Sequence, residues 1–483
     1  MRRRILIPAL CLLLAACHVP AGSPHPSASP TPRPDSVSDS ARAVPPDVER
    51  FRPEVEGLIA DALGRGQSYA LLSELCRVAP LRLSGSVGAE HAVEWAENAM
   101  RRCGLVNVRR EPVRVPRWVR GELEFLARLD AAGLPAERYP ILALGGSVAT
   151  PPGGVSGELV EVRDFEELAR RADEVRGKIV LFNRPMDVLE SDCFAAYGGA
   201  VNQRSTGAVE AAKVGALAAI VRSMTMSLDD YPHTGATRYD PSVQQIPIAA
   251  VSTLGAEDLA RRLRSGERVR LNLQLSCRTL GDVDSANVVG EIRGDVHPEQ
   301  VLVLGGHLDA WDVGHGAHDD GAGCVHALEA ARLIVARGLK PKRTIRVVMF
   351  MNEENGARGA EAYFKTHESE LAHHVLALES DAGGFTPRGF STDAKPETFA
   401  TLAAAARVLE RASATQMIVG WGGVDIGPMA KAAVPLVGFR PDDERYFDHH
   451  HGARDTIDQV HPRELALGAG AISGLAWILA NLE

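Results

Sequence analysis

The sequence predicts an α/β protein with a mostly parallel central sheet that helices flank on both faces. Three observations support this fold class. From Ser285 onward, apolar strand-like runs alternate with helical segments, an order that is typical of parallel sheets. Clusters of polar residues directly follow successive strands in this part. Residues 121–279 also contain strand-like runs but no such clusters, so we expect a separate inserted α/β domain there.

The N-terminus has the pattern of an export signal. Three arginines precede the short apolar run Ile5–Leu14, which is too short for a stable transmembrane helix. Leu14-Ala15-Ala16-Cys17 is similar to a bacterial lipoprotein box. We therefore expect residues 1–17 to be a signal peptide ending at a lipidated Cys17, with plain cleavage near Ala16 as the alternative. The protein would then be periplasmic and lipid-anchored to the outer membrane, or secreted.

Composition indicates a tether after the signal and argues against two kinds of site. Residues 18–47 are rich in Pro, Ser and Ala and predict a disordered tether. The net charge of -9 gives no indication of a nucleic-acid partner. Five cysteines follow Cys17 and none forms a C-x-x-C pair, so a zinc site made of cysteines is not expected. A disulfide between Cys76 and Cys103 is one possibility that the sequence does not decide.

The elements follow from local patterns in chain order. Ala92, Trp95, Ala96 and Ala99 share one face of a predicted helix over 89–103, which Gly104 closes. The other expected helices span 54–64, 324–337 and 464–481, and the expected strands span 106–115, 177–182, 218–221, 246–251, 301–304, 344–351, 375–378 and 434–439. We assign 48–120 and 280–483 to one catalytic domain, interrupted by the insertion at 121–279.

Five polar clusters are expected to meet at one edge of the central sheet, because ligands of such sheets bind beyond the carboxyl ends of the strands. Each cluster combines histidine or acidic residues: His307–Asp309, His318–Asp320, Glu353–Glu354, Glu379–Asp381 and Asp448–His451. Carboxylates packed this densely repel one another unless cations neutralise them. Imidazole and carboxylate ligands together favour Zn²⁺, with Mn²⁺ or Co²⁺ as alternatives.

These residues resemble a known family, the zinc exopeptidases of the bacterial leucine aminopeptidase type, and within it the carboxypeptidase Q (plasma glutamate carboxypeptidase) branch. The match rests on the order and spacing of His307–Gly314, Asp319-Asp320-Gly321, Glu353-Glu354, Glu379–Gly383, and His451 four residues before Asp455-Thr456. The resemblance implies the zinc-exopeptidase (phosphorylase/hydrolase-like) fold, and the insertion resembles a protease-associated domain.

The resemblance also implies roles for single residues. Two metal ions would share Asp319, with His307 and Asp381 completing one site and Glu354 and His451 the other. Glu353 would be the general base that activates a bridging water. Asp309 would accept the second imidazole proton of His307.

Several assignments keep alternatives. His450 is the next candidate if His451 is not the ligand. His318 would line the substrate pocket or be a solvated loop residue. Asp320 would support Asp319, and the resemblance implies a cis peptide between the two. Asp425 would bind a free α-amino group or, as is commoner for such an aspartate, cap the following helix.

The expected function is hydrolysis of terminal peptide bonds in short peptides or dipeptides, by two zinc ions per chain and in a possible homodimer. The sequence does not decide which peptide end is attacked. One alternative is an inactive peptidase-fold binding or receptor protein, which the intact ligand set and Glu353 disfavour. Another is a single-zinc glutaminyl cyclase.

Overall fold

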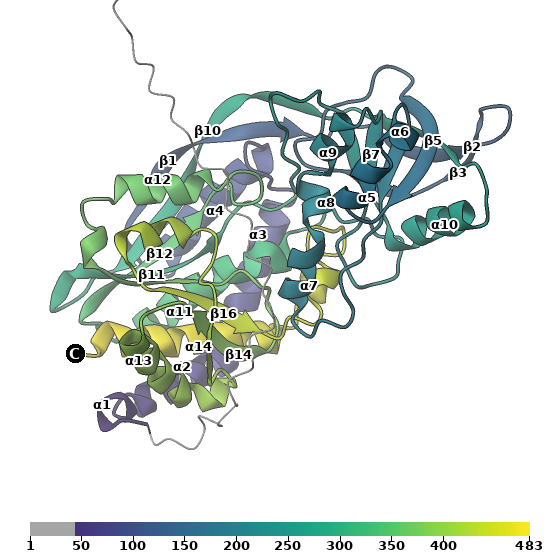
Figure 1. Cartoon of the computed structure of the whole chain (residues 1–483). Coiled ribbons are helices and arrows are strands. Elements are labelled where there is room, and N and C mark those ends of the chain that lie inside the picture. Colours follow the sequence, from purple (N-terminus) through teal and green to yellow (C-terminus); the bar gives the residue numbers. More distant parts are fainter. Residues whose placement is uncertain (1–43) are drawn as a thin grey trace, which may run out of the picture. The chain divides into compact units, whose positions relative to one another are not determined.

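Two eight-stranded sheets make up the β structure of residues 44–483, the part of the chain that the computed structural model describes. The predicted signal peptide, the predicted lipidation site Cys17 and most of the predicted tether lie outside the described residues. Residues 44–483 form one compact unit, shown in Figure 1.

The first sheet carries the strands expected after Ser285. Its centre is parallel, with β12, β11, β13 and β16 side by side, whereas β10 runs antiparallel to β1 and β12, and β14 runs antiparallel to β16. The α/β class is therefore confirmed, but the sheet as a whole is mixed, because a long β1–β10 ribbon and the β14–β15 pair extend it on either side. In spatial order the strands are β1 (Val106–Val119), β10 (Arg278–Ile292), β12 (Arg343–Phe350), β11 (His297–His307), β13 (His374–Glu379), β16 (Leu436–Pro441), β14 (Pro387–Thr392) and β15 (Gln416–Val419).

Helices cover both faces of this sheet. Along β11, Leu302 and Leu304 pack into one apolar cluster and Val301 and Val303 into another, as the alternation of side chains along a strand requires. On the first face lie α2 (Arg52–Arg65), α3 (Ser68–Val78), α4 (Val87–Arg102), α11 (Ala322–Ala336) and α14 (Pro462–Asn481). The second face carries α12 (Arg358–Thr366) and the 3-10 turn Gly427–Ala432.

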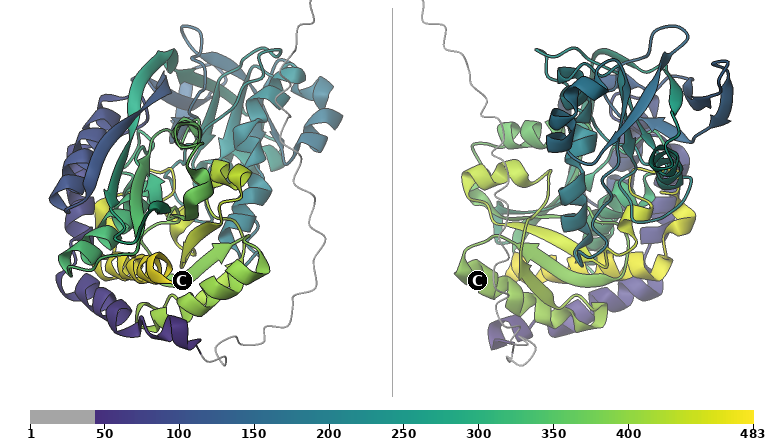
Figure 2. Two further views of the ribbon diagram at one scale, coloured as in Figure 1. Left: turned by 90° about the vertical axis from the view of Figure 1, so that its left-hand side faces the viewer. Right: turned by 45° about the vertical axis from the view of Figure 1, so that its right-hand side comes forward.

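Helix α14 is long and apolar enough to cross a membrane by length and composition alone. However, 94% of its apolar 18-residue stretch is buried inside the protein. It packs beside α2 in the core, and both views of Figure 2 show the yellow C-terminal helix next to the purple N-terminal helices. A core role therefore explains its composition.

The second sheet is built entirely from residues 124–275. Its parallel strands β5, β6, β7 and β8 were predicted in part from apolar runs, and all residues of β6, β7 and β8 are buried. The extent of this sheet agrees with an insertion at 121–279, whose protease-associated identity stays a prediction. The spatial order is β3 (Pro135–Arg138), β2 (Glu124–Leu129), β9 (Arg270–Leu275), β5 (Val155–Val162), β6 (Ile179–Phe182), β7 (Ala218–Arg222), β8 (Ile248–Val251) and β4 (Ile141–Ala143).

The helices of this part are α5 (Phe165–Arg170), α6 (Ala172–Val175), α7 (Cys193–Ala200), α8 (Asn202–Ser205), α9 (Gly207–Lys213) and α10 (Thr253–Arg264). The remaining α-helices of residues 44–483 are α1 (Pro46–Glu49) and α13 (Pro396–Ala406).

Every cysteine of the described residues is a buried free thiol, so the Cys76–Cys103 disulfide left open by the sequence is not formed.

Candidate metal centre

Three neighbouring parallel strands deliver side chains to one edge of the first sheet. His307 is the last residue of β11, Glu353 and Glu354 follow the end of β12, and Asp381 lies two residues after β13. Asp319 comes from a turn over Ala317–Gly321 that runs directly into α11. The sequence-based expectation that these clusters meet at the carboxyl ends of the strands is borne out by this arrangement.

Asp319 lies between two groups of possible ligand atoms. On one side, His307 Nε2 is 3.3 Å from Asp319 Oδ1 and 3.5 Å from Asp381 Oδ1. On the other, His451 Nε2 is 3.3 Å from Asp319 Oδ2 and 3.1 Å from Glu354 Oε2. His307, Asp319 and Glu354 also have ligand atoms within 4.8 Å of one another. The five predicted ligands therefore converge, with each carboxylate oxygen of Asp319 facing a different histidine.

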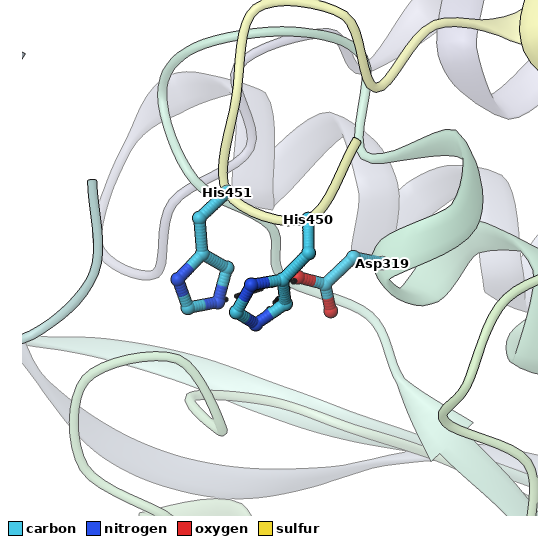
Figure 3. A group of neighbouring side chains, drawn as sticks. All are labelled: Asp319, His450 and His451. Carbon is cyan, nitrogen blue, oxygen red and sulfur yellow. Dashed lines mark ion pairs between the residues drawn. The ribbon is translucent and has the colours of Figure 1, made fainter. Parts of the chain in front are cut away.

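His450 lies farther from this centre than His451. Its Nε2 is 3.9 Å from Asp319 Oδ2, and its ring stacks on that of His451 with the centroids 3.6 Å apart. Figure 3 shows the two rings face to face beside Asp319. Although Asp319, His450 and His451 could together hold an ion, only His451 also approaches Glu354.

Two carboxylate oxygens at the centre are buried and accept no hydrogen bond, namely Asp319 Oδ2 and Asp381 Oδ1. A buried charge without a partner is costly. Burial raises the pKa of Glu354 and of Asp381, and the nearby charge of Asp319 adds to this effect. A divalent cation bound by these oxygens would remove both costs, so the donor set fits a metal site of the imidazole–carboxylate type.

The protonation of the histidines is also suited to a metal. Burial, together with the neighbouring His450, holds the pKa of His451 well below its usual range, so its ring is neutral and can donate a lone pair. Burial alone would lower the pKa of His307, but the Asp381 and Asp319 carboxylates raise it well above the usual value. A metal at His307 would take the place of that proton.

Asp309 differs from its predicted role. His307 Nδ1 lies 3.0 Å from the backbone oxygen of Asp309, not from its carboxylate. Asp309 Oδ1 instead accepts hydrogen bonds from the backbone N–H groups of Asn352, at 2.6 Å, and Glu353, at 3.1 Å. The carboxylate turns away from the imidazole because it closes the turn after β12. Asp309 thus holds His307 through its carbonyl and Glu353 through its side chain.

Two other aspartates fix the backbone of the metal-binding loops. Asp320 Oδ2 accepts from the backbone N–H of His307 at 3.0 Å and Asp320 Oδ1 from that of Gly323 at 2.9 Å, so Asp320 supports His307 and the start of α11. The Asp319–Asp320 peptide bond is cis, as the resemblance implied. Asp455, which sequence analysis used only as a landmark, accepts from the N–H of His318 at 2.7 Å and of Asp319 at 3.1 Å.

Neither interpretation of His318 was right. It is fully buried, stacks on Phe385 at 4.2 Å between centroids, and accepts the N–H of Gly384 at 3.1 Å. Burial lowers its pKa to about 3, so the ring is a neutral packing group. No local pattern indicates this packing, because Phe385 lies 67 positions away from His318.

The capping role considered for Asp425 is also wrong. The turn Gly427–Ala432 begins after Ile426 and has no side-chain cap. Asp425 is fully buried, and neither of its carboxylate oxygens has a hydrogen-bond partner. It lies beside Glu379, whose charge adds to burial in raising the pKa of Asp425.

The part between residues 121 and 279 contributes to the centre, although sequence analysis expected no chemistry there. Arg204 Nη1 lies 3.2 Å from His451 Nδ1. Thr234 donates its N–H to the carbonyl of His451 at 2.9 Å, and His233 Nδ1 lies 2.6 Å from the carbonyl of His450. These contacts hold the loop that carries both histidines.

Arg82 clamps the loop that leads to Asp319. Its fully buried guanidinium donates to the carbonyls of Leu308, at 2.7 Å, His315, and Gly316, at 2.7 Å. Arg82 lies more than 220 positions before these acceptors, so no local pattern could have identified it.

Two cavities border the centre. A small one touches Asp319, Glu354 and His451. A larger one, with a volume of about 360 Å³, touches Asp381 and opens between α7 and the loop after β15, and its size suits a short peptide.

Comparison with known proteins identifies the family of the chain. The sequence model of peptidase family M28 matches residues 287–474, which include every predicted metal ligand. Human carboxypeptidase Q is 38% identical over 419 residues, covering 87% of this chain and 86% of the relative. Carboxypeptidase Q of the mouse is 36% identical over the same length, covering 87% of each chain.

Solved structures agree. A peptidase M28 precursor from Shewanella amazonensis has 33% sequence identity and a TM-score of 0.86, covering 90% of this chain and 97% of the other. An aminopeptidase from Aneurinibacillus has the same fold at 21% identity, with a TM-score of 0.61 and coverage of 89% and 97%. The recognition made from the sequence is confirmed, and the chain belongs to peptidase family M28, as a metallopeptidase.

Proposed function

We propose that this metallopeptidase is a dinuclear zinc exopeptidase that hydrolyses the terminal peptide bond of short peptides, including dipeptides. The observation that carries the proposal is the position of Asp319, whose two carboxylate oxygens each lie 3.3 Å from a different histidine nitrogen. One carboxylate between two ligand groups is the arrangement that a bridged metal pair requires.

His307 and Asp381 would hold one ion and Glu354 and His451 the other, with Asp319 shared. When bound, a zinc pair supplies Lewis-acid chemistry, polarising the scissile carbonyl and making the attacking water more acidic. Mn²⁺ or Co²⁺ would suit the same donors.

Glu353 is the proposed general base. Its side chain is 19% exposed, whereas that of Glu354 is 1% exposed, so of the adjacent pair Glu353 is the one open to substrate. Burial, opposed by His307 and reinforced by Asp381, raises the pKa of Glu353 to about 8. Glu353 takes a proton from the attacking water and delivers it to the nitrogen of the leaving amine. Asp309 positions Glu353 through the backbone N–H of that residue.

Other predictions complete the proposal. The strands between Glu124 and Leu275 would form the protease-associated-like insertion, and its contacts with the loop of His451 give it a supporting role. Export as a Cys17 lipoprotein would place the enzyme in the periplasm, where short peptides are available.

Glu353→Gln tests the proposal. The amide keeps the shape of the side chain but cannot accept the proton, so activity on dipeptides should fall by about 10²- to 10⁴-fold while zinc content stays unchanged. Glu361→Gln, at an exposed position in α12, is the matched control and should leave both unchanged. Unaltered turnover in Glu353→Gln would remove this residue from the mechanism. A single zinc in the fully active protein would instead favour the cyclase-like alternative.

A further inference from the structure

The larger cavity contains one cationic side chain among its lining residues, Arg440. Four acidic residues also line it: Asp192, Glu379, the proposed metal ligand Asp381 and Asp443. The walls are largely apolar, with Phe194 from α7 on one side and Val419 and Trp421 on the other. A lone guanidinium in such a surrounding is well suited to an anionic group of a ligand.

The sheet places Arg440 beside the metal centre. Strands β13 and β16 are parallel neighbours, with Glu379 opposite Gly438. Asp381 and Arg440 each lie two residues beyond this pair, and both line the cavity. Adjacent strands are about 4.8 Å apart, so the strand that carries Arg440 lies directly beside the one that leads to Asp381.

Alternation along β16 directs Arg440 toward the cavity. Val437 and Phe439 pack into the core against the helices of the first face, so Gly438 and Arg440 point to the opposite side. At Gly438 that side is covered by the loop of Trp421 and Gly422, because an added Cβ would lie 2.9 Å from their carbonyl oxygens. The same loop lines the cavity.

The guanidinium is not used by the fold. Arg440 is half-buried, and within residues 44–483 its guanidinium forms neither a hydrogen bond nor an ion pair. The adjacent strand offers a contrast, since Arg388 on β14 is exposed and pairs with Asp442. Asp443 also lines the cavity, and the charge of Arg440 partly offsets the burial that raises the pKa of Asp443, but the two side chains form no ion pair. The guanidinium can therefore still bind an anionic group of a ligand.

We propose that Arg440 binds a carboxylate of the peptide substrate, which makes it a specificity residue of the proposed exopeptidase. Two sources share this chemistry: the free α-carboxylate of a short peptide and the side chain of a glutamate or aspartate. In a dipeptide the α-carboxylate lies only about one residue, roughly 3.8 Å, beyond the scissile carbonyl. The inference rests on the proposed function for its substrate but not for its test, which measures binding.

The test uses the full-length, zinc-loaded Glu353→Gln protein, with Arg440 intact or changed to Met. Calorimetry measures binding of Leu-Leu, Leu-Leu-amide, Leu-Glu-amide and Glu-Leu-amide. Loss of one charged hydrogen-bonding partner should weaken binding of carboxylate-bearing peptides by about 10- to 100-fold and leave Leu-Leu-amide within about 3-fold. Loss confined to Leu-Leu identifies the α-carboxylate as the partner, and loss confined to the glutamate peptides identifies the side chain.

Arg388→Met is the matched control and should bind all four peptides as the parent does. Equal weakening of all four peptides by Arg440→Met, or no weakening of any, would overturn the proposal. Turnover of the same peptides by the wild-type enzyme is measured separately. If the zinc-loaded wild type hydrolyses none of them, the proposed function fails, while the calorimetry still decides the role of Arg440.

Discussion

Arg82 offers the sharpest test of how the N-terminal region supports the metal centre. Arg82→Met keeps the apolar stem of the side chain and removes the guanidinium, which donates to the carbonyls of Leu308, His315 and Gly316. All three acceptors lie in the loop between His307 and Asp319. The substitution leaves the buried carbonyl of Leu308 without a donor inside the protein, whereas Gly316 keeps the N–H of Gly321 at 3.0 Å and His315 keeps the thiol of Cys76 at 3.8 Å.

The expected cost follows from these three contacts. A buried acceptor left unsatisfied costs about 1–3 kcal/mol, and each of the two carbonyls that keep another donor loses a hydrogen bond worth about 0.5–1.5 kcal/mol, which together give about 2–6 kcal/mol. Single substitutions rarely exceed about 5 kcal/mol, because water and local shifts satisfy some groups. We therefore expect Arg82→Met to lower the free energy of unfolding by about 2–5 kcal/mol.

Urea denaturation of the zinc-free protein measures this change, and Arg117→Met, at an exposed position in β1, is the control. The same variant should bind zinc more weakly, because the loop it loosens carries Asp319. A loss of less than about 1 kcal/mol, or unchanged zinc affinity, would refute the idea that Arg82 holds this loop.

Two further predictions concern the acidic surroundings of the metals. Burial raises the pKa of Asp455 to about 7 and the pKa values of Glu353 and Glu379 to about 8. These pKa values exceed those of the same groups in the unfolded chain, so the folded protein binds more protons. The zinc-free protein should therefore lose stability as pH rises from about 4.5 to 8. Thermal unfolding at several pH values should show this loss of stability when a chelator is present and a much smaller loss when zinc is bound. Equal pH dependence of stability with and without zinc would contradict the prediction. Asp455→Asn removes a carboxylate oxygen that accepts the N–H groups of His318 and Asp319. In a chelator competition it should weaken zinc binding about 10- to 100-fold, whereas Asp458→Asn, at an exposed position, should not. Equal zinc affinities of the two variants would exclude this supporting role of Asp455.

The sequence predicted the parts of the fold that local pattern controls. The runs that became β11, β12 and β13 are mostly apolar and end in polar clusters, so both the strands and their shared edge could be inferred. Strands β14 and β15 were missed: β15 is short and mostly exposed, and the pairing of β14 with β16 depends on contacts that follow folding.

The same distinction applies to the site. Ligands could be predicted because histidine and acidic residues are informative wherever they cluster. Their supports could not, because they depend on distant partners: Arg204 meets His451 across 247 positions. The carboxylate of Asp309 was misassigned because a position two residues from His307 does not decide between its carbonyl and its side chain.

Zinc bound per chain is the most direct test of the two-metal centre. We predict two zinc ions in the wild-type protein, one in His451→Ala, and two in His450→Ala, because only His451 lies within 3.5 Å of both Asp319 and Glu354. A wild-type protein that holds one ion at saturation, or a loss of zinc in His450→Ala with none in His451→Ala, would contradict the account.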